Sequence, residues 1–341
     1  PDRTFYYELL PSNQLELGLW LESERMLHAE IDQIGVDTQR EVVKEEKRQR
    51  YSRPYATFPE NIFKRLYTKH PYNWTPIGSM EHLNSASLEN FISFYDRFYS
   101  PNNATLSLAG DFDIPETKEL IKAYFNDIPM GPSVVQPTIK DDPLGEEKTA
   151  IIYDDIQLPA IMLGYRMPPR ASDDAYALQM LSTVLSGGAS SRMYKRLVDD
   201  DQSAAFVQVF PFSLEQGGAF ITFSVANAGK SITDMKPAIE EEIDRLKNEL
   251  ISEREFEKIQ NQMESGFIQS NSTMAGIAES LADYHTFYND ANYINTEIER
   301  YRNVTRESIQ RVAKKYLTKE NRVVLSYLPK SQKPESSENS K

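Results

Sequence analysis

The residues SLENFISFYDRFYSPNNATL, positions 87–106, are matched without a gap by TRESIQRVAKKYLTKENRVV, positions 305–324, which lie 218 positions later. The two stretches are identical at Glu89 and Asn103 and similar at most of the apolar positions. In both, a hydroxyl residue precedes an amphipathic helical pattern, which is followed by a short turn and a β-prone segment. A pattern that recurs at a fixed spacing predicts a duplicated structural unit.

The spacing also predicts how much of the first unit is present. The second unit begins near residue 149, and 149 minus 218 is −69. A complete first unit would therefore begin about seventy residues before Pro1. We expect the first unit in this chain to lack its opening strands and its first helix.

Composition restricts the class of protein. The 341 residues, 40% hydrophobic and 26% charged, suit a globular protein with two domains of ordinary size. A net charge of −13 argues against a nucleic-acid partner, since phosphate recognition needs clustered Lys and Arg. The chain has no Cys, which excludes disulfides, thiolate nucleophiles and Cys-ligated metals. No apolar run is long enough for a membrane span.

Helical and β-prone segments alternate along the chain without strict β-α-β order, which predicts an α+β fold. We expect two homologous halves, each a mainly antiparallel sheet packed with helices, the first half being incomplete. A stretch of prolines, glycines and charges without periodicity is the best domain boundary. The predicted divisions are a first half at 1–130, a linker at 131–148, a second half at 149–329 and a disordered tail at 330–341.

Within the first half, the segment Phe5 to Leu10 is apolar and β-prone, and Ala104 to Ala109 is a predicted strand. A helix is expected after Pro11, and a second one from about Thr38, where Thr38-x-x-Glu41 has the pattern of a capping box. The aromatic residues of the helix that follows Ser87 recur at helical spacing, so we expect them in a core.

Glu46 is the charged residue of most interest. It lies four positions after Val42 and three after Val43, so the helical period places it on the same face as both, together with Gln39. A carboxylate in an apolar stripe needs a metal, a cation or a hydrogen-bond network. The alternative is that the charged run from Lys44 to Arg50 is a solvated face which Glu46 merely borders.

Other catalytic patterns are missing from the sequence. The histidines His28, His70, His82 and His285 have no mutual spacing typical of metal ligands, so we expect surface or core roles for them. No nucleophile elbow, Walker loop or dinucleotide-binding glycine pattern occurs.

Several short motifs, in this order and spacing, resemble the pitrilysin/insulinase-type zinc metallopeptidases, and most closely their bacterial processing-peptidase-like branch. The similarity extends over nearly the whole chain from Pro1 to Pro329. The motifs are Arg40 to Glu46, His70-Pro71-Tyr72, Pro76-Ile77-Gly78, Tyr99-x-Pro101-x-Asn103, Gly110-Asp111, Gly187-Gly188, Ser190 to Leu197 and Phe256 to Phe267.

The resemblance implies two homologous halves that enclose a cavity, and a zinc ion held by two His of an H-x-x-E-H motif and by a later Glu. The matching motif implies that Glu46 is this third ligand. By the same match, H-x-x-E-H would lie about thirty residues before Pro1. This chain then contains no catalytic residue and is expected to be inactive alone, whereas the full-length protein would be a zinc endopeptidase acting on peptides or unfolded segments.

Some positions depart from the family pattern. Gln39 stands where members often have a second Glu, and Val198 and Ala205 align with an Arg and a Tyr that steady the substrate in active members. The alternative is therefore a non-catalytic member that serves as a partner or peptide-binding subunit. A homodimer or a heterodimer with a family partner is compatible with both functions, and the resemblance implies an extracytoplasmic, periplasmic location in a bacterium.

Overall fold

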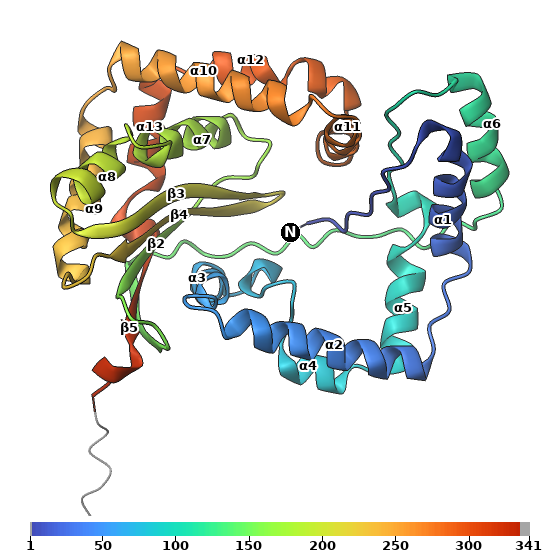
Figure 1. Cartoon of the computed structure of the whole chain (residues 1–341), viewed down its shortest axis with the longest axis horizontal. Helices are drawn as coiled ribbons and strands as arrows, with labels where there is room; N and C mark the ends of the chain where they lie inside the picture. Colours follow the sequence, from blue (N-terminus) through green and yellow to red (C-terminus); the bar gives the residue numbers. More distant parts are fainter. Residues whose placement is uncertain (1, 335–341) are drawn as a thin grey trace, which may run out of the picture.

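The computed structural model describes residues 2–334, which form an N-terminal part (residues 2–126) and a C-terminal part (residues 148–334) joined by an extended segment (Figure 1). The helices of the N-terminal part are α1 Leu15–Leu27, α2 Gln33–Tyr51, α3 Phe58–Leu66, α4 Met80–Ser85, α5 Leu88–Phe98 and α6 Ile114–Phe125, with 3₁₀ turns η1 Ser12–Gln14, η2 Pro71–Asn73 and η3 Pro101–Asn103.

The C-terminal part contains every strand that the described residues form. Its elements in chain order are β1 Lys148–Asp154, β2 Ala160–Arg166, α7 Asp173–Ser186, α8 Arg192–Tyr194, the π-helix η4 Lys195–Asp200, β3 Ala204–Leu214, β4 Gly217–Ala226, α9 Ile232–Asn248, α10 Glu253–Ser270, α11 Met274–Tyr288, η5 Ala291–Asn295, α12 Glu297–Arg302, α13 Arg306–Tyr316, η6 Lys319–Asn321, β5 Arg322–Pro329 and η7 Lys330–Gln332. The expected tail at 330–341 thus begins with η7, and residues 335–341 lie outside the described residues.

The strands form one sheet in the order β1-β5-β2-β4-β3. β1 is parallel to β5, and all other neighbours are antiparallel. On the central strand β2, Met162 lies opposite Leu325 of β5 and Phe223 of β4. Because β2 has neighbours on both edges and helices over both faces, its residues 160–165 are all buried and almost all apolar. The mainly antiparallel α+β arrangement expected from the sequence is confirmed.

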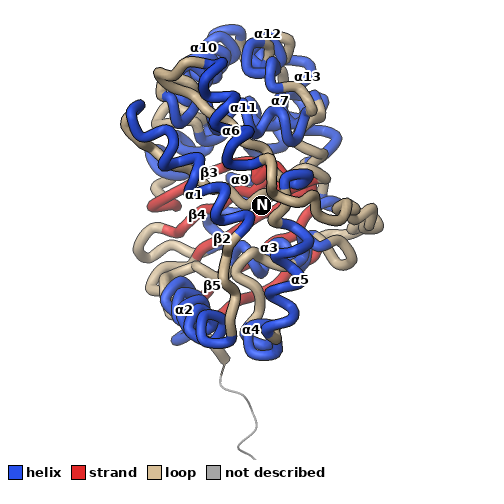
Figure 2. Tube along the Cα trace, turned by 90° about the vertical axis from the view of Figure 1, so that its right-hand side faces the viewer, coloured by secondary structure: helices blue, strands red, loops and turns tan. Residues whose placement is uncertain are grey.

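Helices from both parts cover this sheet (Figures 1 and 2). On one face, α7, α9 and α13 pack against alternate residues of β2 such as Ile161 and Leu163. On the opposite face lies α3 of the N-terminal part, whose Ile62 and Leu66 are fully buried in a cluster with Met162. A fully buried aliphatic side chain contributes on the order of 1.5–3 kcal/mol, so α3 is a substantial part of this core.

The two other segments expected to be strands differ from the prediction. Phe5–Leu10 and Ala104–Ala109 have no strand partner among the described residues. The backbone of Ala104 is nevertheless extended, with φ −122° and ψ 147°. The local sequence therefore specifies an extended chain, whereas a strand also needs a neighbour to receive its hydrogen bonds.

Helix α2 begins earlier than predicted. Its N-cap is Asp32, whose side chain accepts a hydrogen bond from the Gly35 backbone N–H at 2.6 Å. Thr38, the expected cap, lies inside the helix and donates its hydroxyl proton to the carbonyl of Ile34 at 2.8 Å. Both residue types can cap a helix, but only Asp32 has the extended backbone that an N-cap requires.

The helices of the two parts follow the same order. α1, α2, α3, α4 and α5 each begin within two residues of a position 218 before the start of α9, α10, α11, α12 and α13, respectively. The 3₁₀ turns η3 and η6, which follow α5 and α13, start 218 residues apart. The spacing found in one short stretch of sequence therefore extends over about ninety residues of structure.

The two stretches that revealed the spacing also share their hydrogen bonds. Ser87 and Thr305 are the N-caps of α5 and α13, and each takes part in a capping box. The side-chain amide of Asn103 donates to the carbonyl of Phe98 at 2.9 Å, and that of Asn321 donates to the carbonyl of Tyr316 at 2.8 Å. The identical Asn residues thus have identical local roles.

Among residues 2–334, no helix combines the length and apolar character needed to cross a membrane.

Candidate functional site

Helix α2, which contains Glu46, is held in place by its basic side chains. Nε of Arg40 donates to the carbonyl of Leu83 at 2.8 Å, and its Nη2 donates to the carbonyl of Ala86 at 2.6 Å. Lys47 is buried and donates to the carbonyl of Gly78. These bonds connect α2 to the chain on either side of α4, so the backbone around Glu46 is well supported.

The face of α2 on which Glu46 lies differs from the prediction. The packed side of the helix contains Val36, Arg40 and Lys47, whereas Glu46 and Val42 lie on the outer side. The Glu46 side chain is 53% exposed, and its Oε1 accepts a hydrogen bond from Arg50 at 2.9 Å. The expectation of an inward apolar stripe was wrong, because the helix packs through the stems of basic residues instead.

Gln39 lies on the same exposed side of α2, about one helical turn from Val42 and about two turns from Glu46. The two polar side chains and Val42 therefore form a small surface in the N-terminal part. Across residues 2–334, no three His, Cys, Asp or Glu side chains lie close enough together to hold a metal ion.

His70 has a structural environment. It is buried, its Nδ1 accepts a hydrogen bond from the Tyr72 backbone N–H at 3.1 Å, and its Nε2 lies 3.1 Å from Oε1 of Gln216. Its ring lies against that of Tyr72 with 4.2 Å between ring centroids. Both ring nitrogens are therefore engaged, as expected for a core histidine.

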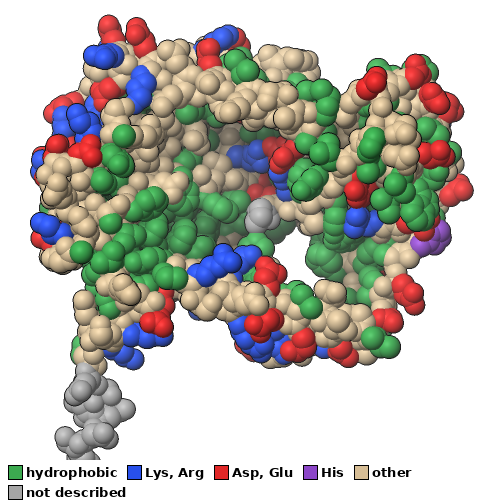
Figure 3. All heavy atoms as spheres, in the orientation of Figure 1, with side chains coloured by type: hydrophobic (Ala, Val, Ile, Leu, Met, Phe, Trp, Pro, Cys, Tyr) green, Lys and Arg blue, Asp and Glu red, His purple; other side chains and the backbone are tan. Residues whose placement is uncertain are grey.

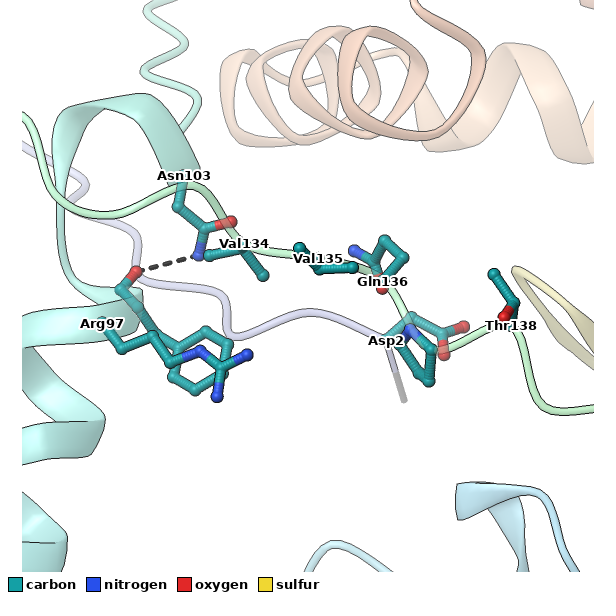
Figure 4. Close-up of a pocket in the computed structure, with 9 residues that line it drawn as sticks. Asp2, Arg97, Asn103, Val134, Val135, Gln136 and Thr138 are labelled. Carbon is teal, nitrogen blue, oxygen red and sulfur yellow. Dashed lines mark hydrogen bonds between the residues drawn. The ribbon is translucent and has the colours of Figure 1, made fainter.

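A hollow of about 740 Å³ lies between the N-terminal part and the extended segment, on the open side of the molecule that Figure 3 shows. Its wall includes Val134 to Thr138 of the extended segment, together with Asp2, Arg97 and Asn103 (Figure 4). Asp2 is already engaged, since its carboxylate accepts hydrogen bonds from the Tyr72 hydroxyl at 2.7 Å and from a backbone N–H of the β3–β4 turn at 2.7 Å. Among residues 2–334, the lining therefore offers space and the guanidinium of Arg97, but no pair of acid and base.

The family-like motifs of the C-terminal part meet in space. Arg192 makes a bidentate ion pair with Glu255 at 2.9 and 3.0 Å, and Lys258 donates to the Ser190 hydroxyl at 2.6 Å. The hydrogen bond from Arg192 lowers the pKa of Glu255 to about 2. These contacts fasten α8 to the start of α10, which is a structural role.

The two positions aligned with a substrate-steadying Arg and Tyr carry no such groups. Val198 is packed against the core between the sheet and α9, and Ala205 is an exposed residue of β3. Neither side chain can donate a hydrogen bond to a developing charge.

Asp141 is an organising residue that the sequence did not reveal. Burial would raise the pKa of its carboxyl, but the backbone N–H groups of Thr68, Lys69 and His70 donate to it and hold the pKa well below its usual value. The interaction joins residues more than seventy positions apart. No local pattern around Asp141 could have predicted it, because the donors are backbone groups of a distant turn.

Comparisons with known proteins identify relatives of this chain. A family profile described as "Peptidase M16 inactive domain" matches residues 85–263. The chain is similar to a Helicobacter pylori protein named zinc protease PqqE, at 26% identity over 319 residues that cover 92% of this chain and 72% of that protein.

Solved structures have the same arrangement of sheet and helices. A protease from Helicobacter pylori superposes with a TM-score of 0.88 at 25% identity, over 93% of this chain and 77% of that one. The periplasmic protease PqqL from Escherichia coli superposes with a TM-score of 0.72 at 16% identity, over 93% of this chain and 37% of that one, a likeness that concerns the fold alone.

Proposed function

Since this chain belongs to the M16, pitrilysin-type family of peptidases, we propose that the full-length protein is a zinc-dependent endopeptidase. Its substrates would be peptides or unfolded segments held in a cavity between its two parts. The observation that carries the proposal is the position of Glu46, which is exposed on a well-supported helix with a single partner, Arg50. An exposed ion pair of this kind contributes about 0–1 kcal/mol, so it is readily exchanged for a metal.

The described residues do not by themselves fit a zinc ion. Zinc in proteins takes three or four nitrogen, sulfur or oxygen ligands, and the neighbours of Glu46 on its face are Gln39, Val42 and Arg50. The remaining ligands would have to come from outside residues 2–334. We therefore assign one candidate ligand to this chain and no catalytic step.

The test compares two neighbouring carboxylates in the full-length protein. Glu46 and Glu45 are 53% and 54% exposed, and each pairs with an Arg on α2, so they are matched in all but the face they occupy. Glu46→Gln is expected to lower zinc affinity by at least about tenfold and to abolish peptide cleavage. Glu45→Gln should change neither zinc content, measured by elemental analysis, nor cleavage. Unchanged zinc content in Glu46→Gln would disprove the ligand assignment.

A second function is supported by Val198, Ala205 and Gln39. Val198 and Ala205 lack the hydrogen-bond donors of active members, and Gln39 carries an amide where those members often have a second carboxylate. The matching profile is also described as an inactive domain. The second proposal is a non-catalytic partner or peptide-binding subunit, as a homodimer or with a related chain. This second proposal would be favoured if the full-length protein contained no zinc and bound peptides without cleaving them. Light scattering would identify the oligomeric state.

We also propose an extracytoplasmic location, because the related fold of PqqL belongs to a periplasmic protease. Fractionation of the source cells, followed by detection of the protein with an antibody, tests this proposal.

A further inference from the structure

The extended segment between the two parts is fastened near both ends and free in between. Near its start, the Asn102 side chain accepts a hydrogen bond from the Gly131 backbone N–H at 2.8 Å and donates to the Gly131 carbonyl at 3.2 Å. Near its end, the Asp141 carboxylate accepts hydrogen bonds from the backbone N–H groups of residues 68–70. Within the part of the chain that the structure describes, no backbone–backbone hydrogen bond reaches residues 133–140.

The same residues are open to solvent. Val135 is 77% exposed and Ile139 is 46% exposed, and the chain from Val134 to Thr138 runs along the wall of the hollow (Figure 4). A protease binds its substrate as an extended strand whose backbone groups must be unpaired. Most exposed loops have to unfold locally to meet this requirement, whereas residues 133–140 meet it as they are.

The turn between β4 and α9 shows the contrast. Ala228 is exposed as well. The N–H of Asn227 donates to the carbonyl of Ser203 at 2.9 Å, however, and the N–H of Lys230 donates to the carbonyl of Asn227 at 3.0 Å. A protease could bind this turn only after these bonds had been broken. Exposure alone therefore does not distinguish residues 133–140, whereas the lack of backbone hydrogen bonds does.

We propose that residues 133–140 are a processing site, at which an endopeptidase selective for small apolar side chains cuts beside Val135 and leaves a two-chain protein that stays assembled. The cut hydrolyses the Val134–Val135 or the Val135–Gln136 peptide bond. Water supplies the hydroxyl group of the new carboxylic acid and a hydrogen of the new amine, so no other reactant is needed. The four residues 133–136, Ser-Val-Val-Gln, include no charged or aromatic side chain that such an enzyme would reject. This proposal does not depend on the zinc ligand or on peptidase activity of the protein itself.

The two fragments would remain together because α3 lies in the core of the C-terminal part. Ile62 and Leu66 are fully buried against the sheet. The Tyr67 hydroxyl donates to the carbonyl of Gly218 at 2.8 Å and accepts a hydrogen bond from the Gly218 N–H at 2.8 Å. The bonds to Asp141 also join the two fragments, since Asp141 follows the cut and its donors precede it. None of these contacts requires the peptide bond that is cut.

Limited digestion with pancreatic elastase, which cuts after small apolar residues, tests both parts of the proposal. Mass spectrometry is expected to find the first cut within residues 133–136. The nicked protein should leave a size-exclusion column in native buffer at the volume of the uncut protein. A first cut elsewhere, such as after Ala228, would overturn the site. Fragments that separate without denaturant would overturn the assembled two-chain product.

A matched pair of variants separates this site from general sensitivity to proteases. Val135→Pro places a proline at both candidate bonds, and it should slow elastase cleavage of the segment by at least about tenfold. The fold should be unchanged, because the N–H that is lost makes no backbone hydrogen bond. The control Ile139→Pro alters another exposed residue of the same segment beyond both bonds, and it should be cut as fast as the unchanged protein. Equal cleavage of Val135→Pro and the unchanged protein would contradict the assigned site.

Discussion

Glu297, at the start of α12, lies in an unusual environment for a carboxylate. The hydroxyl of Tyr284 donates to it, and the hydroxyl of Tyr176 lies 3.5 Å from its Oε1. Burial, with a smaller contribution from Asp283, raises the pKa of Glu297 to about 7, although Arg170 and the Tyr176 hydrogen bond counteract part of the increase. The group therefore changes charge near neutral pH.

The sign of the resulting pH dependence follows from that increase. Because the folded-state pKa exceeds the unfolded value near 4.5, the folded protein keeps a proton that the unfolded chain releases. The stability that Glu297 contributes is complete below pH 4.5 and is lost as the pH rises through about 7. We expect the melting temperature of Glu297→Gln to fall less between pH 5 and pH 7.5 than that of the unchanged protein.

The exposed residue Glu299 provides the control for this prediction. It pairs with Arg302 on the surface of the same helix. Glu299→Gln should therefore retain the pH dependence of the unchanged protein. Identical pH profiles for Glu297→Gln and the unchanged protein would show that burial of Glu297 has no effect on stability.

At the scale of single residues, the sequence predicted less than at any other scale. It singled out Glu46 as a candidate metal ligand, which stays a prediction, and left open whether its face is apolar or solvated. A period of 3.6 shows which residues share a face but does not show what covers that face. It gave no indication of Asp141, whose three backbone donors are supplied by a turn in a different part of the chain.

Individual elements were more predictable when a local cap defined them. Ser87 and Thr305 marked the starts of α5 and α13 correctly. The start of α2 was missed because two residues able to cap a helix, Asp32 and Thr38, lie six positions apart. Ala104–Ala109 shows that a β-prone sequence does not supply its own neighbour.

The paired Asn residues after α5 and α13 allow a prediction for these elements. Asn321 donates to the carbonyls of both Tyr316 and Arg166, the latter at 2.9 Å, whereas Asn103 donates to Phe98 alone. In the 341-residue chain, Asn321→Ala is expected to cost about 1–3 kcal/mol and Asn103→Ala about 0.5–1 kcal/mol.

Urea unfolding of the two variants measures this difference. The reverse order of the two costs would contradict the assigned hydrogen bonds.

The arrangement of the whole molecule depends on the contact between α3 and the sheet. On β2, a Cβ added at Gly164 would lie 2.6 Å from Cγ1 of Ile62 and 2.9 Å from its Cδ1. Gly164→Ala is therefore expected to force α3 away from the sheet and to destabilise the protein by about 1–3 kcal/mol.

A second glycine gives the opposite expectation. Gly266 lies on α10 with no atom within 4 Å of an added Cβ. Gly266→Ala should stabilise the protein by about 0.5–1 kcal/mol, since Ala favours a helix more than Gly does. Thermal unfolding monitored by circular dichroism compares the two variants, and a neutral Gly164→Ala would mean that α3 does not pack closely on the sheet.

The position of α3 also determines when its contacts can form during synthesis. Its Ile62 and Leu66 leave the ribosome before β2, and long before Tyr327 of β5, which belongs to the same cluster. At roughly 5–20 residues per second, the interval between Leu66 and Tyr327 is on the order of ten to fifty seconds. For that time the nascent chain exposes the apolar side of α3 without the strand that completes its cluster, so this part of the core can close only after the last strand has emerged.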